Sequence, residues 1–522
     1  MFDSYFTPQG QGAIAASVLC TVVAMAAFIK VRDRLALIAL FLGALILRML
    51  LIQLDPFLHT WDEVVHAVVA KNMAVEPLRP MLFTEPLLAS DHTHWTENHI
   101  WLHKQPFFLW CMALSIKFLG STVLAVRLPG ALMTTLLVFF THGMARMLYG
   151  RSVAFAAAVL MTWAYWPLKM MMGAVATDHN DVFFLVLIAG SFWAWLRYQQ
   201  TPTRVWVVAI GVFAGLAVLT KWLLGLLVFG GWACALLAAV VREQRVVEQV
   251  RHAVFAFGIT AAISLPWQLY TWLNFPVEMA HEQAYNWQHI IMPVEGHRGA
   301  WDFHFKALGE HLYPLPLWII LGAFAFALFS IKDIRDRVFV GIVVVAVHLF
   351  FGLSATKMVN YTVVLFPLFL IALAWAVVGV VERVPRRSWR PVLVCVALVG
   401  IGSMLLQFER VQLVHTAQSA RDPFHHWYRS TQLHNLGAGE RLAEELSGSR
   451  PVVFNVPFPA NLSLAFFQDI EASTALPTSA QVDALRERGY DVVVVDPPWE
   501  MSSVVADKVM IVQMEEHAFK WL

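Results

Sequence analysis

The stretch "HTWDEVVHAVVAKNM", from His59 to Met73, follows an apolar run over residues 35–54 and places two acids, Asp62 and Glu63, side by side. A run of about 17 to 25 apolar residues is long enough to cross a hydrocarbon layer about 30 Å thick. The two acids are therefore predicted to lie at a membrane surface. Because similar apolar runs recur along the chain, this stretch indicates the fold of the whole.

The composition supports a membrane protein. Hydrophobic residues make up 59% of the 522 residues, charged residues only 14%, and the mean hydropathy is +0.62. A water-soluble domain of this size does not normally have that balance. The net charge is +1 and the Lys and Arg residues are scattered, which gives no indication of a nucleic-acid partner. We therefore expect an all-α polytopic membrane protein.

The cysteines and the N-terminus do not point to a secreted, disulfide-bonded domain. The first twelve residues, "MFDSYFTPQGQG", contain Asp3 and no Lys or Arg, so they lack the basic region of a cleaved signal peptide. The first apolar run is therefore expected to remain as a helix. The four cysteines lie inside apolar segments, so we expect them to pack in the core and not to form a disulfide or a zinc cluster. They are Cys20, Cys111, Cys234 and Cys395.

Twelve apolar runs are candidates for transmembrane helices. They cover residues 12–30, 35–54, 128–145, 153–172, 181–197, 205–220, 222–241, 253–270, 315–331, 338–355, 361–380 and 391–409. Lys and Arg gather in alternate loops, at 30–34, 146–151, 197–204, 242–251, 332–337 and 382–390. Such a bias marks the cytoplasmic side, so the N-terminus and the other loops are predicted to lie outside.

Two further helical segments are predicted to lie in the outer interface. "QPFFLWCMALSIKFLG" (105–120) is apolar, but counting it as a crossing would place the basic loop "ERVPRRSWR" (382–390) outside. We therefore expect an interfacial helix there, and another at 64–73. The resulting organisation is a transmembrane domain over 1–409, with outer loops at 55–127 and 271–314.

Residues 410–522 are predicted to form a small external α/β domain. This tail contains more Asp and Glu than Lys and Arg, and it is less apolar than the rest of the chain. The β-branched runs "PVVFN" and "DVVVVD" favour strands, and "SAQVDALRERGY" between them favours a helix.

Polar residues that a bilayer tolerates poorly gather on the predicted outer side. They include Asp62 and Glu63, the loop "HTHWTENHIWLHKQP" (92–106), "ATDHND" (176–181), Lys221 and Lys357. Ionisable residues near hydrocarbon are costly and often mark a functional site, although Lys and Arg at helix ends also snorkel without any function. Several basic and acidic residues from separate loops on one face favour a site.

The order of these segments resembles a known family. The outer "DE", "HKQPFFLW", "AVRLPGAL", "TDHND", "GLAVLTKWLLGLLV" and "FFGLSATKMVNYTVVLFPLFLIAL" together are similar to the lipid-linked sugar transferases of the GT-C type, over residues 35 to 380. The branch is that of the bacterial lipid A aminoarabinose transferase and the protein O-mannosyltransferases (family 39/83-like). The first helix, 12–30, looks like an addition to the family plan.

The resemblance implies a glycosyltransferase that uses a polyprenyl phosphate sugar donor. It implies transfer at the outer face of the membrane to a lipid, glycan or protein acceptor, by a single inverting displacement and without a nucleotide cofactor. It also implies a multi-pass protein of the bacterial inner membrane, with the active site and the C-terminal domain on the periplasmic side.

The residues can be interpreted for this chemistry without the family. An anionic lipid phosphate needs cations, because charge-assisted hydrogen bonds to phosphate are short and strong, and positive groups stabilise the charge that grows on a leaving phosphate. The candidates are Lys104, Lys221, Lys357 and Arg127. A carboxylate within about 3 Å of an acceptor hydroxyl can act as general base, and Asp62 is our candidate.

Two interpretations of Glu63 are open. It is a catalytic candidate beside Asp62, but adjacent helical residues do not face one site. The alternative is that both acids serve the first turn of a helix, where the dipole favours negative charge.

Two more candidates come from the resemblance. Asp178 matches a second acid that binds sugar or metal, and the alternative is an ordinary polar turn. Tyr361 matches a position near the donor phosphate, and the alternative is an aromatic residue at the membrane interface.

The histidines raise the question of a divalent metal. The family pattern before the first-loop lysine is a glutamate followed by "KPP", whereas this chain has "HKQP", so His103 stands where an acid is expected. "GHRGAWDFHF" resembles the family stretch that carries a metal-binding or donor-contacting histidine, here His297. Imidazole is a good zinc ligand, so zinc, magnesium or manganese at His103 and His297 is a hypothesis.

Two other functions remain open. A transporter or flippase for a lipid-linked or anionic substrate would also place charges in the membrane, but no internal repeat is visible and the charges gather at one face. A membrane scaffold without enzyme activity would leave Lys104, Asp62 and Asp178 unexplained.

Overall fold

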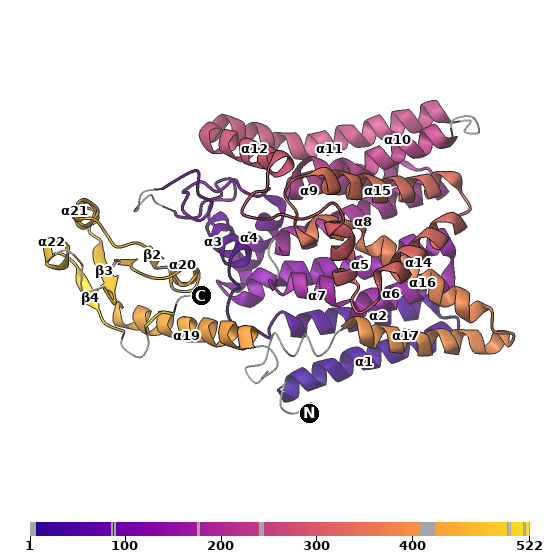
Figure 1. The fold of residues 1–522 in the computed structure, drawn as a ribbon, viewed down its shortest axis with the longest axis horizontal. Helices are drawn as coiled ribbons and strands as arrows, with labels where there is room; N and C mark the ends of the chain where they lie inside the picture. Colours follow the sequence, from indigo (N-terminus) through magenta and orange to yellow (C-terminus); the bar gives the residue numbers. More distant parts are fainter. Residues whose placement is uncertain are drawn as a thin grey trace. The chain divides into compact units, whose positions relative to one another are not determined.

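The computed structural model describes residues 7–84, 87, 90–174, 178–239, 245–406, 423–497, 501, 503–514 and 518–520. The chain is mostly helical and forms two compact units. Unit 1 consists of Met1–Leu51, Lys104–Phe108 and Gly130–Phe408, and unit 2 of Ile52–His103, Leu109–Pro129 and Glu409–Leu522. Figure 1 shows the course of the chain.

Unit 1 is a bundle of long helices that lie side by side (Figure 1). Its elements are α1 (Pro8–Ile29), α2 (Asp33–Leu51), α6 (Arg151–Trp163), α7 (Tyr165–Met171), α8 (Asp178–Gln200), α9 (Arg204–Lys221), η2 (Trp222–Leu226), α10 (Leu227–Ala239), α11 (Val246–Asn274), α12 (Pro276–Ile291), α13 (Phe303–His311), α14 (Leu317–Ser330), α15 (Ile334–Leu353), η3 (Val359–Leu365), α16 (Phe366–Glu382), η4 (Arg387–Trp389) and α17 (Arg390–Leu406). Helices α4 (Phe107–Leu119) and α5 (Val123–Tyr149) have residues in both units.

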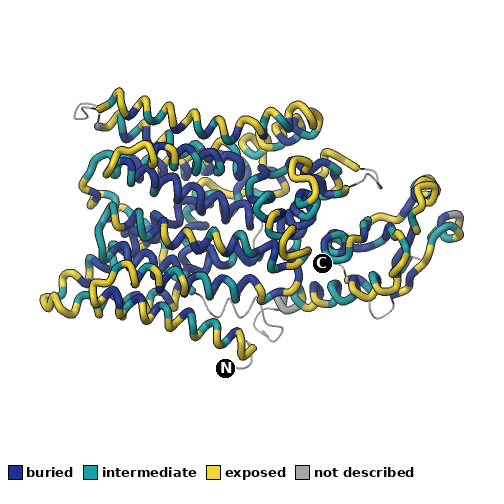
Figure 2. The backbone as a smooth tube through the Cα atoms, turned by 180° about the vertical axis from the view of Figure 1, so that it is seen from behind, coloured by how far each residue is buried: buried dark blue, intermediate teal, exposed yellow. Residues whose placement is uncertain are grey.

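The core of unit 1 lies around α8. In the most apolar window of each span, 89% of the α8 residues are buried, against 22% in α11 and 28% in α1 and α17. Figure 2 shows buried residues on the middle helices and exposed residues on the outer ones. A helix that is apolar all round and exposed on one side suits contact with lipid. The chain is therefore an integral, multi-pass membrane protein.

The predicted count of twelve spans is not confirmed. Within the described residues, nine helices are long and apolar enough to cross a membrane, or ten if the bent pair α6 and α7 is one span. The predicted spans 205–220 and 222–241 form one apolar run, Arg204–Ala238, which is interrupted at Trp222 by a backbone φ of 55°. The predicted span 315–331 is the 14-residue helix α14, only about 21 Å long.

A buried arginine stabilises the break between α6 and α7. The two helices are bent by 44° at Ala164, and such a bend leaves carbonyls without helical partners. Arg48 of α2, fully buried, lies 3.4 Å from the carbonyl oxygen of Met161 and 3.5 Å from that of Thr162. Its Nε also donates to the Thr134 hydroxyl at 3.1 Å. An intramembrane charge is costly, and these contacts offset part of that cost.

Unit 2 contains a small α/β sandwich. Its four strands, all parallel, have the order β2-β1-β3-β4, with β1 (Pro451–Phe454), β2 (Glu471–Ala472), β3 (Asp491–Val495) and β4 (Met510–Val512). The helices are α3 (Asp62–Met73), α19 (Pro423–Glu445), α20 (Ala460–Gln468), α21 (Ser479–Glu487) and α22 (Ser503–Ala506). β1, β3 and α21 lie where the sequence predicts strands and a helix, and a separate domain over residues 410–522 stays a prediction.

Alternation along the strands builds two hydrophobic layers. Val453 and Val493 pack with residues of α19 and α20, whereas Val452 and Val492 pack with residues of α21 and α22. Successive strand residues point to opposite faces, so a strand covered on both faces is apolar along its buried part, as the four valines of β3 after Asp491 are. Helix α3 packs against α20, and the Lys71 ammonium donates to the carbonyls of Ala465 and Phe466.

Candidate active site

The two adjacent acids at the start of α3 have different surroundings. Trp61, which precedes the helix, has a left-handed φ of 69° that turns the chain sharply into α3. Glu63 is fully buried, and its carboxylate oxygens accept hydrogen bonds from Arg127 Nε at 2.7 Å and Nη2 at 2.8 Å. The backbone N–H of His59 donates to the same carboxylate at 2.7 Å. Glu63 is thus held in a bidentate ion pair.

Arg127 is equally enclosed. It is 1% exposed, and besides Glu63 it donates to the backbone carbonyls of Ile52, Asp55 and Phe57, at 3.3, 3.0 and 2.9 Å. Its guanidinium therefore fixes the segment that joins the second span to α3. This geometry favours a structural role for both members of the pair.

Asp62 is the more accessible acid of the two. Its side chain is 12% exposed, and one carboxylate oxygen lies 3.8 Å from Nε2 of the buried His66, one turn further along α3. The His66 ring in turn meets Trp101 edge-on, with 5.6 Å between ring centroids. The imidazole and the helix N-terminus can both stabilise a carboxylate at this position.

Unit 1 brings together two predicted donor-binding residues and one further acid. Lys221, the last residue of α9, forms an ion pair with Asp181, which lies in the first turn of α8. The Lys221 ammonium lies 5.1 Å from the ring centroid of Tyr361 in η3. The Asp181 side chain is 1% exposed and that of Lys221 is 20% exposed. The acid is therefore buried behind a partly accessible cation.

Lys357 belongs to the same neighbourhood. The Tyr361 ring stacks on Phe351 at 4.5 Å, and the Lys357 ammonium donates to the carbonyl of Phe351 at 2.8 Å. It also donates to the carbonyls of Gly352 and Ser354, each at 2.6 Å. Lys357 thus caps the C-terminal carbonyls of α15, and burial lowers the pKa of its ammonium.

The turn that carries Lys357 pairs with the loop that carries His297. The backbone N–H groups of Thr356 and Lys357 donate to the carbonyls of His289 and His297, at 3.0 and 3.1 Å. His297 is half-buried. The predicted residues Lys221, Tyr361, Lys357 and His297 therefore belong to one connected region of unit 1.

The remaining candidates have fewer described contacts. Lys104 of unit 1 is half-buried, just before α4. Asp178 is the first residue of α8, and its side chain lies outside the described part of the structure. His103 of unit 2 is half-buried, and its ring stacks on Trp95 at 5.6 Å and meets Trp101 edge-on at 5.7 Å.

A metal does not fit the described side chains well. His103 is in contact with aromatic rings, and within the ranges that the structure describes no three His, Cys, Asp or Glu side chains gather as metal ligands. Zinc sites need three or four such ligands. A metal at His103 and His297 stays a prediction.

The sequence did not reveal a second polar network, which joins α19 to the loop before α3 within unit 2. Arg429 forms an ion pair with Asp55, which also lies 3.4 Å from His59 Nε2. The Tyr428 hydroxyl lies 2.8 Å from the Thr60 hydroxyl and 3.3 Å from His59 Nδ1. Burial raises the pKa of Tyr428 and lowers that of Arg429. Polar contacts between residues so distant in sequence leave no local pattern.

Sequence comparison finds relatives for the middle of the chain. Residues 103–267 match the family described as dolichyl-phosphate-mannose-protein mannosyltransferase. An undecaprenyl phosphate-α-4-amino-4-deoxy-L-arabinose arabinosyl transferase from Pseudomonas fluorescens is 26% identical over 162 residues. That match covers 31% of this chain and 28% of the relative, so it spans less than a third of the relative's length.

Structural comparison extends the likeness to most of the chain. The crystal structure of ArnT from Cupriavidus metallidurans bound to undecaprenyl phosphate has a TM-score of 0.60 and 16% sequence identity, covering 92% of this chain and 90% of that one. The oligosaccharyltransferase AglB from Archaeoglobus fulgidus, in complex with an inhibitory peptide and a dolichol-phosphate, has a TM-score of 0.51 and 13% identity, covering 84% and 64%. The chain thus has an ArnT-like fold and is similar in sequence to aminoarabinose and mannosyl transferases, which confirms the predicted resemblance to lipid-linked sugar transferases of the GT-C type.

Proposed function

We propose that this chain is a membrane glycosyltransferase that moves a sugar from a polyprenyl phosphate donor to a lipid, glycan or protein acceptor. The observation that carries the proposal is the group of Asp181, Lys221 and Tyr361, in which a partly exposed ammonium is held at a helix end within an ArnT-like fold. Asp181 and Lys221 both lie in the stretch that matches the mannosyltransferase family.

Lys221 is the cation best placed for the donor phosphate. In this proposal the bond between the anomeric carbon and the phosphate oxygen breaks, and the electron pair leaves with the polyprenyl phosphate. The ammonium stabilises the negative charge that grows there, as fixed cations do in a partly dry site. Asp181, buried against Lys221, holds it in position.

Asp62 is proposed as the general base. The acceptor oxygen attacks the anomeric carbon from the face opposite the leaving phosphate, so the sugar configuration inverts, and the acceptor proton passes to the carboxylate. Glu63 is less suitable, because both of its oxygens accept hydrogen bonds from Arg127. His66, 3.8 Å from Asp62, is a positioning residue in this scheme.

The other predicted residues receive narrower roles. Lys357 holds the turn before Tyr361, since its ammonium donates to three carbonyls. Arg127 fixes the loop before α3, and Lys104 and Asp178 are kept as proposed donor and sugar contacts. No step of the proposal passes through a metal ion or a nucleotide cofactor.

The active site is proposed to lie at the periplasmic side of a bacterial inner membrane, where the tail over residues 410–522 would also lie. The charge bias supports this orientation. The basic loop 197–204 joins the C-terminus of α8 to the N-terminus of α9, whereas Asp181 and Lys221 are at the opposite ends of the same helices. If the basic loop is cytoplasmic, this group of residues faces outside.

Turnover in detergent distinguishes a transferase from a transporter or flippase. The purified protein would be mixed with undecaprenyl phosphate sugars and an envelope extract, and the release of undecaprenyl phosphate would be measured by mass spectrometry. A transferase consumes the donor although no compartments exist. No consumption of any donor by folded protein that binds undecaprenyl phosphate would favour transport instead.

A further inference from the structure

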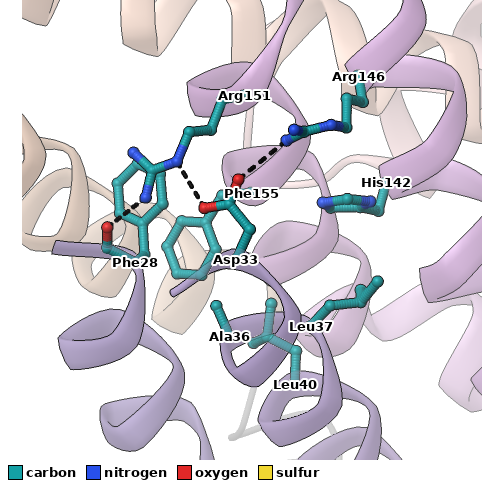
Figure 3. A pocket seen from close by; sticks show the side chains of 9 residues that line it. All are labelled: Phe28, Asp33, Ala36, Leu37, Leu40, His142, Arg146, Arg151 and Phe155. Carbon is teal, nitrogen blue, oxygen red and sulfur yellow. Dashed lines mark hydrogen bonds and ion pairs between the residues drawn. The ribbon is translucent and has the colours of Figure 1, made fainter. Parts of the chain in front are cut away.

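A pocket in unit 1 contains none of the residues proposed for the active site. It lies among α1, α2, α5 and α6 and is open to solvent (Figure 3). Asp33, Arg146 and Arg151 form its charged lining, and His142 and Leu37 also line it. It shares no residue with the group of Asp181, Lys221 and Tyr361.

The polar end of the pocket resembles an anion site. Arg151 Nε contacts one carboxylate oxygen of Asp33 at 2.6 Å, and Arg146 Nη1 contacts the other at 3.2 Å. One carboxylate therefore bridges two guanidiniums, as a phosphate would, and one positive charge is left over. The Arg151 guanidinium also lies 4.2 Å from the ring centroid of Phe28, which fixes its plane. Planar guanidiniums suit bidentate recognition of phosphate.

Further cations and an apolar track adjoin the pocket. Lys30, Arg32 and Arg34 are exposed in the loop before and at the start of α2. On α5, Leu132, Leu136 and Phe139 are 48%, 40% and 36% exposed, and they lie at helical spacing on the face that also presents Arg146 seven residues after Phe139. A phosphate at Arg146 would therefore have an acyl chain beside this track.

We propose that this pocket binds the phosphate group of an anionic phospholipid of the bilayer, with its acyl chain along α5. Basic pockets between transmembrane helices on the cytoplasmic side suit such headgroups. The inference does not depend on the proposed transferase activity. Free inorganic phosphate has the same headgroup chemistry, but it would gain nothing from the exposed apolar stripe.

Native mass spectrometry of the delipidated full-length protein tests the site. Cardiolipin, phosphatidylglycerol and phosphatidylethanolamine would be titrated onto wild type and the Arg146→Gln variant. Losing one charge-assisted contact is expected to weaken binding of the anionic lipids on the order of tenfold. Binding of phosphatidylethanolamine should weaken less, because its own ammonium already neutralises the phosphate. The matched control is Arg245→Gln, which removes an equally charged, exposed arginine that pairs with Glu248. If both variants weaken lipid binding equally, the proposed site is overturned, because the loss would then come from the general surface charge of the protein.

A second variant separates a lipid site from a purely structural ion pair. Asp33→Asn removes the carboxylate that competes with a phosphate, so it should retain or strengthen anionic lipid binding. If Asp33→Asn lowers lipid binding as much as Arg146→Gln does, while both remain folded in thermal unfolding, the proposal is overturned. In a separate experiment, inorganic phosphate is added as a competitor of the bound lipid. If it displaces the lipid at a concentration equal to that of the lipid, the pocket binds free phosphate and the lipid assignment is contradicted.

Discussion

At the scale of single residues, two adjacent carboxylates have different environments. The sequence places Asp62 and Glu63 together, but only the structure distinguishes the accessible acid from the one enclosed by Arg127. Arg127, the partner of Glu63, is 64 residues away along the chain, and no local pattern reveals such a pairing. Asp181 is a similar case, because the resemblance singles out Asp178, three residues earlier, and only the structure pairs Asp181 with Lys221.

The buried pair makes a prediction about stability. Glu63→Gln would leave the Arg127 guanidinium without a compensating charge, and breaking a buried ion pair on one side costs about 3–5 kcal/mol. We expect a clearly lower midpoint of thermal unfolding in detergent. Asp62→Asn, the neighbouring control, removes a carboxylate that is partly exposed and should shift the midpoint much less. Equal midpoints for Glu63→Gln and wild type would contradict a structural role.

Lys221 makes a prediction about donor binding. Undecaprenyl phosphate should raise the unfolding midpoint of the wild type, because a ligand that binds only the native state stabilises it. Lys221→Ala should weaken that binding on the order of tenfold, since one charge-assisted contact is lost. The control is Lys306→Ala, whose side chain is 69% exposed and pairs with Asp302. An unchanged ligand-induced shift in Lys221→Ala would remove Lys221 from the proposed site.

At the scale of elements, the hydrophobic pattern predicts where helices form better than it predicts how many of them cross the membrane. The apolar runs became helices, and the β-branched runs "PVVF" and "DVVVV" became paired strands. The number of membrane spans was less predictable, because local backbone geometry decides whether an apolar run forms one continuous helix. The bend between α6 and α7, the left-handed Trp222 and the short α14 all interrupt runs that look continuous in hydropathy.

The contacts of Arg48 at the bend between α6 and α7 predict a measurable contribution to the stability of the fold. Arg48→Met keeps the length of the side chain but leaves the carbonyls of Met161 and Thr162 without this donor. An unsatisfied buried polar group costs about 1–3 kcal/mol, so we expect a lower unfolding midpoint than in Arg245→Met, where the arginine is 66% exposed. If both variants unfold at the wild-type midpoint, Arg48 does not stabilise the bend.

Helix α13 gives a prediction about pH. Burial lowers the pKa of His304 to about 4 and of His311 to about 3, and Lys357 adds repulsion at His304. In the unfolded chain both would titrate near their ordinary value of about 6.5. The native state therefore binds fewer protons below that pH, so stability is full above pH 6.5 and falls as pH drops toward 4.

We accordingly expect a lower unfolding midpoint at pH 5 than at pH 7.5. The double variant His304→Gln, His311→Gln should show a smaller difference between the two pH values, because neither residue can then take up a proton. A difference as large as that of wild type would mean that other groups cause the acid sensitivity.

At the scale of the whole molecule, the fold was predicted more completely than the site. Composition, loop charge and the order of motifs indicated a helical membrane protein of the ArnT-like kind, and the structural likeness covers 92% of the chain. Lys221 and Tyr361 lie close together in unit 1, and their role at the donor phosphate stays a prediction. Contacts between the tail and the first loop, such as Tyr428 with Thr60, lay beyond sequence reasoning, because 368 positions separate the two residues.

The most direct test of the central claim is the rate at which purified protein releases undecaprenyl phosphate from its sugar-linked donor, compared between wild type and Asp62→Asn. We predict that Asp62→Asn loses at least about a hundredfold in rate, the usual contribution of a general base, while the thermal shift caused by undecaprenyl phosphate is retained. Release by Asp62→Asn at the wild-type rate with a hydroxyl acceptor would contradict the account.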